Sequence, residues 1–198
     1  MINTSNTISL PSNLFHRTLH GRMLLLMFLL LGALIGITWL MVYVMVSSIL
    51  EEYIGRNALN VSKAVSLTTV VQEGLKNNNS SKIQMYAESV RKATGARFVV
   101  VGDHEGRRYS HPVPERIGKF MVGGDNPRAL EKGEAYVSKA IGTLGPSMRG
   151  KVPIFDDAGK VIGVVSVGYL QETVESVTEG HLQRVLLWVC GLFLLGGI

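Results

Sequence analysis

Hydrophobic residues are unevenly distributed along this chain, and their longest run lies close to its beginning. From Met23 to Val46 no residue is charged and nearly all are apolar. A helix needs about 20 such residues to cross the hydrocarbon core of a bilayer, so 23–46 is predicted to be a transmembrane helix. A buried core helix and a cleaved signal peptide are the alternatives, but a signal peptide has a shorter apolar region and a cleavage site of small residues.

A second apolar run follows Arg184 and continues to Ile198. It is too short to span a bilayer, yet it stops without a polar flank. We therefore expect 185–198 to be the start of a second transmembrane helix, truncated in this fragment.

Charges that flank the first run predict its orientation. Arg17 and Arg22 precede it, whereas the acidic Glu51 follows it. Because Lys and Arg accumulate on the cytoplasmic side, 1–22 is predicted to be a cytoplasmic tail and 47–184 an extracytoplasmic domain. The protein is thus expected to be a multi-pass inner-membrane protein in contact with lipid, with its domain outside the cytoplasm.

Between the two runs the pattern changes from helical to strand-like. Apolar residues recur at helical spacing over 51–76 and 82–93, and a short helical piece is expected at 127–132. Strand character marks five later segments, which are 97–101, the residues leading to His111, 135–141, 148–155 and 161–169. This order predicts an α+β fold in which N-terminal helices pack on one face of a five-stranded antiparallel sheet. A further helix over 170–184 would lead into the second apolar run.

Composition and charge exclude several classes of function. The net charge is +5, and the domain holds all fifteen acidic and eighteen of the twenty basic residues, which leaves it about +3. Without a long basic run or interleaved aromatic residues, nucleic acid is not an expected partner. The only cysteine, Cys190, excludes a disulfide and a cysteine-based metal site. The sequence has no phosphate loop, metalloprotease helix or nucleophile elbow, so we expect no catalytic residue, cofactor or metal in this fragment.

Two cations mark a candidate binding site. Arg149 and Lys151 are two residues apart on a predicted strand, so their side chains leave from the same face, about 6.5–7 Å apart. Gly150 between them would allow a ligand or another backbone to approach closely. A small molecule with two or more carboxylates would satisfy both cations. The alternative is that both face solvent on the outer side of an edge strand.

Arg108 and His111 form a second cluster, and Ser166 is a third candidate. In a straight strand Arg108 and His111 would point to opposite faces, so they converge only if the chain bends before Pro112. The alternative is an exposed arginine and a hydrogen-bonded histidine. Ser166 lies within an otherwise apolar strand, where its hydroxyl either bonds to the backbone or faces a polar cavity.

These residues lie within motifs that resemble a known family. The chain from about Phe98 to Glu175 resembles the extracytoplasmic PAS-like (PAS/Cache-type) sensor domain of citrate-sensing, CitA-type histidine kinases of two-component systems. The resemblance is carried in one register by VGD at 101–103, RYSH at 108–111, IGK at 117–119, GGD at 123–125, GTLG at 142–145, RGK at 149–151 and GKVIGVVSVG at 159–168.

The resemblance implies which residues hold the ligand. The positions that the family uses for this purpose correspond here to Arg108, His111, Gly142, Thr143, Leu144, Arg149, Lys151 and Ser166. Val100 departs from the family, which can place a hydroxyl residue at this position. Relatives that sense C4-dicarboxylates resemble the chain less at Lys151. A second cation also suits a tricarboxylate better, so citrate is the expected ligand.

The resemblance also implies a role in signalling. Ligand binding would contract the sheet and move the second membrane helix, which would bias a cytoplasmic histidine kinase that is absent from this fragment and that uses ATP and Mg²⁺. A homodimer and a cytoplasmic response regulator are the implied partners. The alternatives are a C4-dicarboxylate sensor kinase, a chemoreceptor with the same outer domain, and a structural or protein-binding membrane protein whose cations face solvent.

Overall fold

The structure, a computed structural model, describes residues 19–170. The predicted exit helix and the second apolar run lie outside this range, as does most of the predicted tail. The chain divides after Val46 into two units, and each is considered by itself. In the first unit the described residues belong to helix α1, Leu19–Ser66, whose apolar side chains are largely exposed there. Among the described residues, α1 is the one helix long and apolar enough to cross a membrane, and its insertion stays a prediction.

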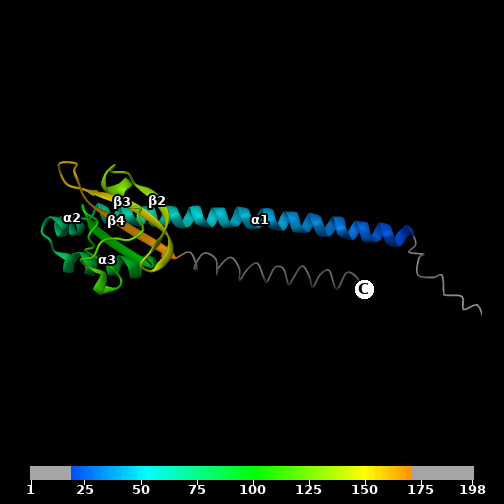
Figure 1. Ribbon diagram of the computed structural model, residues 1–198, viewed down its shortest axis with the longest axis horizontal. Coiled ribbons are helices and arrows are strands. Elements are labelled where there is room, and N and C mark those ends of the chain that lie inside the picture. The colour runs from blue at the N-terminus through cyan, green and yellow to red at the C-terminus, as the bar shows by residue number, and fades with distance from the viewer. Residues whose placement is uncertain (1–18, 171–198) are drawn as a thin grey trace, which may run out of the picture. The chain divides into compact units, whose positions relative to one another are not determined.

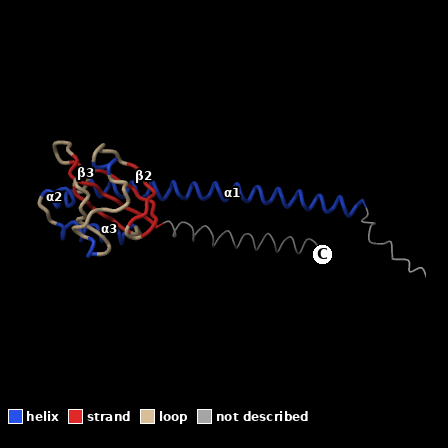
Figure 2. The backbone as a smooth tube through the Cα atoms, viewed as in Figure 1, coloured by secondary structure: helices blue, strands red, loops and turns tan. Residues whose placement is uncertain are grey.

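The second unit packs the end of α1 and the two helices that follow it against one face of an antiparallel sheet (Figures 1 and 2). After the end of α1, its elements are α2 Thr69–Lys76, α3 Ser80–Thr94, β1 Phe98–Asp103, the 3-10 helix η2 Pro114–Arg116, α4 Pro127–Leu130, β2 Tyr136–Gly142, β3 Gly145–Phe155 and β4 Val161–Leu170. The strands lie in the order β1-β4-β3-β2, and every neighbouring pair is antiparallel. The predicted α+β class is confirmed.

The sheet has four strands in the described part of the chain, so the prediction of five strands is wrong by one. The segment leading to His111 makes only isolated bridges. The Ser110 hydroxyl covers the edge of β1 at this point, because it accepts from the Val101 N–H at 2.8 Å and donates to the Val99 carbonyl at 3.2 Å. A side chain thus takes the place of a fifth strand, and Pro112 has no N–H with which to extend a ladder.

Helix α1 ends at Ser66, whereas the spacing of apolar residues predicts one helix over 51–76. Thr68 is extended, with φ −79° and ψ 131°, and its hydroxyl donates to the Ala64 carbonyl at 3.0 Å. Such local bonds compete with the helical backbone, which explains the break. Helix α2 then starts in a new direction that buries its apolar side in the core. At the end of α3, Gly95 is left-handed with φ 66°, a conformation that is common for glycine after a helix.

Alternation along the strands separates an apolar face of the sheet from a polar one. Successive side chains of a strand point to opposite faces, so Val152 and Ile154 of β3 face the helices, whereas Arg149 and Lys151 face away from them. The core on the helical side consists of Val65, Val71, Leu75, Ile83, Ala87, Ala96, Val99, Val101, Ile154, Val165 and Val167. The two cations predicted to share a face therefore do so.

Helix α1 approaches the sheet very closely at Gly150. A Cβ at this position would collide with backbone atoms of Ala58 and Leu59. The buried Ser62 of α1 donates to the Gly150 carbonyl at 2.8 Å and accepts from the Val167 N–H at 3.2 Å. The helix is therefore hydrogen-bonded to β3 and β4 directly behind the two cations.

Candidate ligand-binding site

A cavity lies on the polar face of the sheet. Its volume is about 30 Å³ for the centre of a water-sized sphere, and about 330 Å³ when all space not filled by atoms, including open solvent, is counted. Its lining is made by Phe98, Val100, Arg108, His111, Met121, Val122, Gly142, Thr143, Leu144, Arg149 and Ser166. Seven of the eight residues predicted from the sequence are in this set, and Lys151 is not. That these residues bind a ligand stays a prediction.

Arg108 and His111 both reach the cavity because their segment bends instead of forming a strand. The Gln84 side chain of α3 holds the main chain of His111, since its Oε1 accepts from the N–H at 2.9 Å and its Nε2 donates to the carbonyl at 3.0 Å. The imidazole Nε2 lies 3.1 Å from Thr143 Oγ1, and Nδ1 accepts from the Val113 N–H at 3.0 Å. Burial and the nearby Arg108 lower the pKa of His111, so the ring is neutral at pH 7.

Arg108 is a buried cation without a carboxylate partner. Only 4% of its surface is exposed, and no acidic side chain in the described part of the chain forms an ion pair with it. Burial lowers its pKa, and the positive charges of Arg116 and Arg149 lower it further. A buried charge without a counterion costs several kcal/mol, so an anion in the cavity would stabilise this side chain.

Arg149 is held in a fixed orientation at the wall of the cavity. Its Nε donates to Ser147 Oγ and its Nη2 to the Ala140 carbonyl, each at 2.9 Å. Nη1 points to the segment 121–126, which we call the Asp125 loop, and lies 3.3 Å from the Val122 carbonyl and 3.3 Å from Asp125 Oδ1. A planar fork fixed in this way is suited to a carboxylate.

Lys151 lies on the same face of β3 but beneath the Asp125 loop, and it is fully buried. Its Nζ lies 3.1 Å from Asp125 Oδ1 and donates to Asn126 Oδ1. Burial lowers the pKa of Lys151 to about 8, although Asp125 raises it. Lys151 can therefore contact a ligand only when the Asp125 loop moves.

The sequence pattern misses Asp125 and Asn126 as site residues. Asp125 belongs to the GGD motif, and a polar residue after two glycines and before Pro127 is typical of an ordinary turn. No local signal shows that this turn lies against two buried cations. Only the path of the loop across the sheet brings Asp125 to them.

The β2–β3 turn and the central strands complete the lining. Gly142 packs directly against the Arg149 guanidinium, and a Cβ there would collide with it. Ser166 is buried beside Val100, its partner in the β1–β4 register, and both residues line the cavity. Among the described residues, no group of three or more His, Cys, Asp or Glu side chains could hold a metal ion.

Comparison with known proteins identifies the family. Residues 45–183 match the family described as single cache domain 3. Over 175 residues the chain is 47% identical to the sensor protein CitS of Halalkalibacterium halodurans, covering 88% of this chain and 31% of that protein. Over 146 residues it is 36% identical to the sensor histidine kinase CitA of Klebsiella pneumoniae, covering 74% of this chain and 27% of that protein.

Solved structures agree with this family. The sensor domain of Escherichia coli DcuS, 34% identical, has a TM-score of 0.61 and covers 65% of this chain and 96% of that domain. The sensor domain of Vibrio cholerae DctB has the same TM-score at 16% identity, which supports the fold alone. The chain spans less than a third of the length of the curated relatives CitS and CitA. It belongs to the single cache domain 3 family and carries the sensor domain of CitA/DcuS-type sensor histidine kinases.

Proposed function

We propose that this chain is the sensing part of a two-component histidine kinase and that its cavity binds citrate. The domain would lie outside the cytoplasm, held in the bacterial inner membrane by α1 and a second helix. A kinase domain that uses ATP and Mg²⁺ and a response regulator would complete the pathway, and the sensor would work as a homodimer. The relatives CitS and CitA, which are about three times longer than this chain, support the presence of further domains.

The uncompensated charge of Arg108 is the observation that carries the proposal. Arg108 and Arg149 line one cavity, and the neutral His111 and the Ser166 hydroxyl add polar groups to it. Arg108 has no carboxylate partner among the described residues, so none of their acidic side chains balances its charge. A small carboxylate ligand would supply this charge and fit the hydrogen-bonding groups.

The charge of the site supports a C4-dicarboxylate as the second candidate. Arg108, Arg149 and Lys151 contribute three positive charges, and Asp125 removes one, which leaves two while His111 is neutral. Two charges match malate or fumarate, whereas citrate carries three at neutral pH. The RGK motif with Lys151, by which the chain resembles the citrate-sensing type, supports citrate.

Titration calorimetry on the whole chain in lipid nanodiscs tests the proposal. We expect citrate to bind with measurable heat and more tightly than isocitrate, malate or fumarate. Acetate, with a single carboxylate, serves as the control and is expected not to bind. If none of the larger carboxylates binds, the sensor proposal fails, and binding of malate without citrate would leave only the dicarboxylate alternative.

Citrate affinity is expected to fall as the pH rises through about 8, the pKa of Lys151. An anion favours the charged form of Lys151, so deprotonation of its ammonium weakens binding, by at most about tenfold per pH unit for one proton. Between pH 7 and 9 the pKa values of His111 and Asp125, both lowered, keep these groups from titrating. Lys151→Met should remove this dependence of citrate affinity on pH. An equal dependence in the variant would contradict its assignment to Lys151.

The proposed signal passes through β4. This strand carries Ser166 in the cavity, pairs with β3 beside Arg149, and ends at Leu170, the last residue described. Citrate would shift β4 and, through it, the second membrane helix. The free energy for this shift has to come from the difference in citrate affinity between the two states of the sheet.

A further inference from the structure

The carboxylate of Asp125 occupies the position in which a ligand carboxylate would neutralise Arg149 and Lys151. Its side chain is 13% exposed, and its Oδ1 lies 3.1 Å from Lys151 Nζ and 3.3 Å from Arg149 Nη1. Its Oδ2 accepts from the Ser138 hydroxyl at 2.7 Å. Burial by itself would raise the pKa of Asp125, but Lys151, the hydrogen bond from Ser138 and Arg149 together lower it, so the group is charged at neutral pH.

The backbone of the Asp125 loop is shaped around this ion pair. Gly123 and Gly124 have φ values of 130° and 68°, which residues other than glycine rarely adopt. A Cβ on Gly123 would lie 2.6 Å from Arg149 Nη1 and 2.8 Å from Asp125 Oδ1. The two glycines therefore allow the loop to place a carboxylate directly on the cations.

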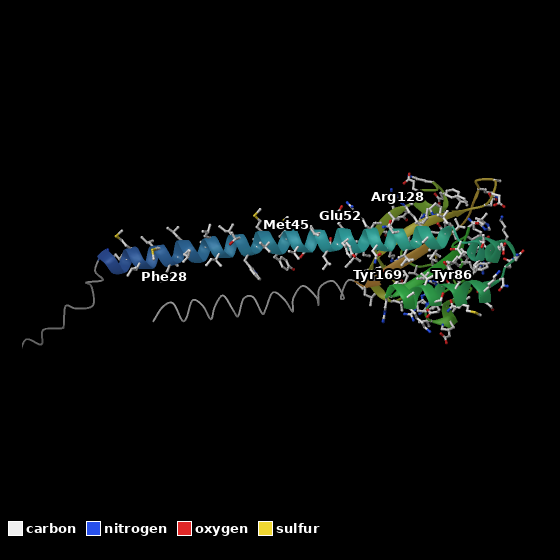
Figure 3. The ribbon with its side chains drawn as sticks, turned by 180° about the vertical axis from the view of Figure 1, so that it is seen from behind. Phe28, Met45, Glu52, Tyr86, Arg128 and Tyr169 are labelled. Carbon is white, nitrogen blue, oxygen red and sulfur yellow. The ribbon has the colours of Figure 1, made fainter. Side chains whose placement is uncertain are left out.

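Contacts outside the cavity fix the loop in place. The Tyr136 hydroxyl donates to the Asp125 carbonyl. Arg128, labelled in Figure 3, lies over the Tyr136 ring at 4.4 Å and pairs with Glu134 at 2.9 Å. Asn126 in turn accepts from Lys151. The position of the Asp125 carboxylate is thus set by the β2 strand as well as by the cations.

We infer that Asp125 is a specificity-determining residue. It sets how much positive charge is available to the ligand, and thereby the relative affinities for ligands with two and with three carboxylates. The inference rests on the proposed binding of a carboxylate in this cavity. Electrostatic attraction grows with the charge of the ligand, so one fixed negative charge beside Arg149 penalises a trianion more than a dianion. Asp125 also engages Lys151, the cation that a third ligand carboxylate would need.

The test compares citrate and malate on the whole chain in nanodiscs, with Asp125→Asn as the variant. At pH 7 we expect citrate affinity to rise by about tenfold and malate affinity by only about threefold, because the trianion gains more. Removal of Asp125 also removes a group that raises the pKa of Lys151. Citrate binding to the variant is therefore expected to take up more protons than in the wild type, which calorimetry in buffers of different ionisation enthalpy measures.

Asp157→Asn is the matched control. Asp157 pairs with Lys76 at 2.6 Å on an exposed surface outside the cavity, so the ratio of citrate to malate affinity should stay the same. Ser138→Ala, which removes only the hydrogen bond to Asp125, should raise this ratio by less than Asp125→Asn does. It also keeps the test decisive if Asp125→Asn does not fold.

The outcomes separate the inference from the proposed function. If Asp125→Asn lowers the affinities for both ligands equally, Asp125 only positions the cations. If the ratio of citrate to malate affinity is otherwise unchanged, Asp125 does not affect specificity. Either result overturns the inference while carboxylate binding stands. A wild-type chain that binds neither ligand would instead refute the proposed function.

Discussion

Replacing Arg149 by alanine is expected to weaken citrate binding by more than tenfold. The guanidinium lines the cavity and is already oriented by Ser147 and the Ala140 carbonyl, so little entropy is lost when it meets a carboxylate. Without it, ligand oxygens are buried with no donor, and each such group costs about 1–3 kcal/mol or more when charged. Calorimetry on the whole chain measures the change in affinity.

Two further variants show whether the fork or only the charge of Arg149 is needed. Arg149→Lys keeps the charge but loses the planar fork, so an intermediate loss of affinity is expected. Arg91→Ala removes the same charge from α3, where Arg91 pairs with Glu88 at 2.7 Å, and should change affinity by less than about twofold because salt screens distant charges. If Arg149→Ala binds citrate as the wild type does, the ligand does not use this cavity.

Gly150→Ala is expected to destabilise the sensor domain by about 3 kcal/mol. The new methyl group would collide with the backbone of Ala58 and Leu59, and a helix backbone cannot rotate away as a flexible side chain can. Separation of α1 from the sheet would also break the hydrogen bonds of Ser62 to the Gly150 carbonyl and the Val167 N–H. Thermal unfolding followed by circular dichroism should show a midpoint lower by about 10 °C.

The same substitution at Gly36 is the control, because a Cβ there meets no atom within 4 Å. Alanine is also the better helix former, so no loss of stability is expected. Because Gly150 lies between Arg149 and Lys151, the displaced strand should also bind citrate more weakly. Equal midpoints for the two variants would mean that α1 and β3 have room for a side chain at Gly150.

Local patterns account for most of the fold. Strands β3 and β4 lie within a few residues of the predicted 148–155 and 161–169, and a turn that begins at Asp156 joins them. Asp156 Oδ1 accepts from the N–H groups of Ala158 and Lys160 at 2.9 and 2.8 Å, which is a bond made within the turn itself. The fifth strand was predicted wrongly because its segment is shaped by a non-local bond. Ser110 bonds to a strand that precedes it by about ten residues.

The sequence by itself determined the apolar run of α1, the α+β class and the shared face of Arg149 and Lys151. Each of these depends on spacing within one element, where the periods of helix and strand apply. Only the tertiary structure decided that Arg108 and His111 line one cavity with Arg149, and that Asp125 contacts Lys151. These contacts join residues more than twenty positions apart, so they depend on strand register and on the paths of loops, which local spacing does not specify.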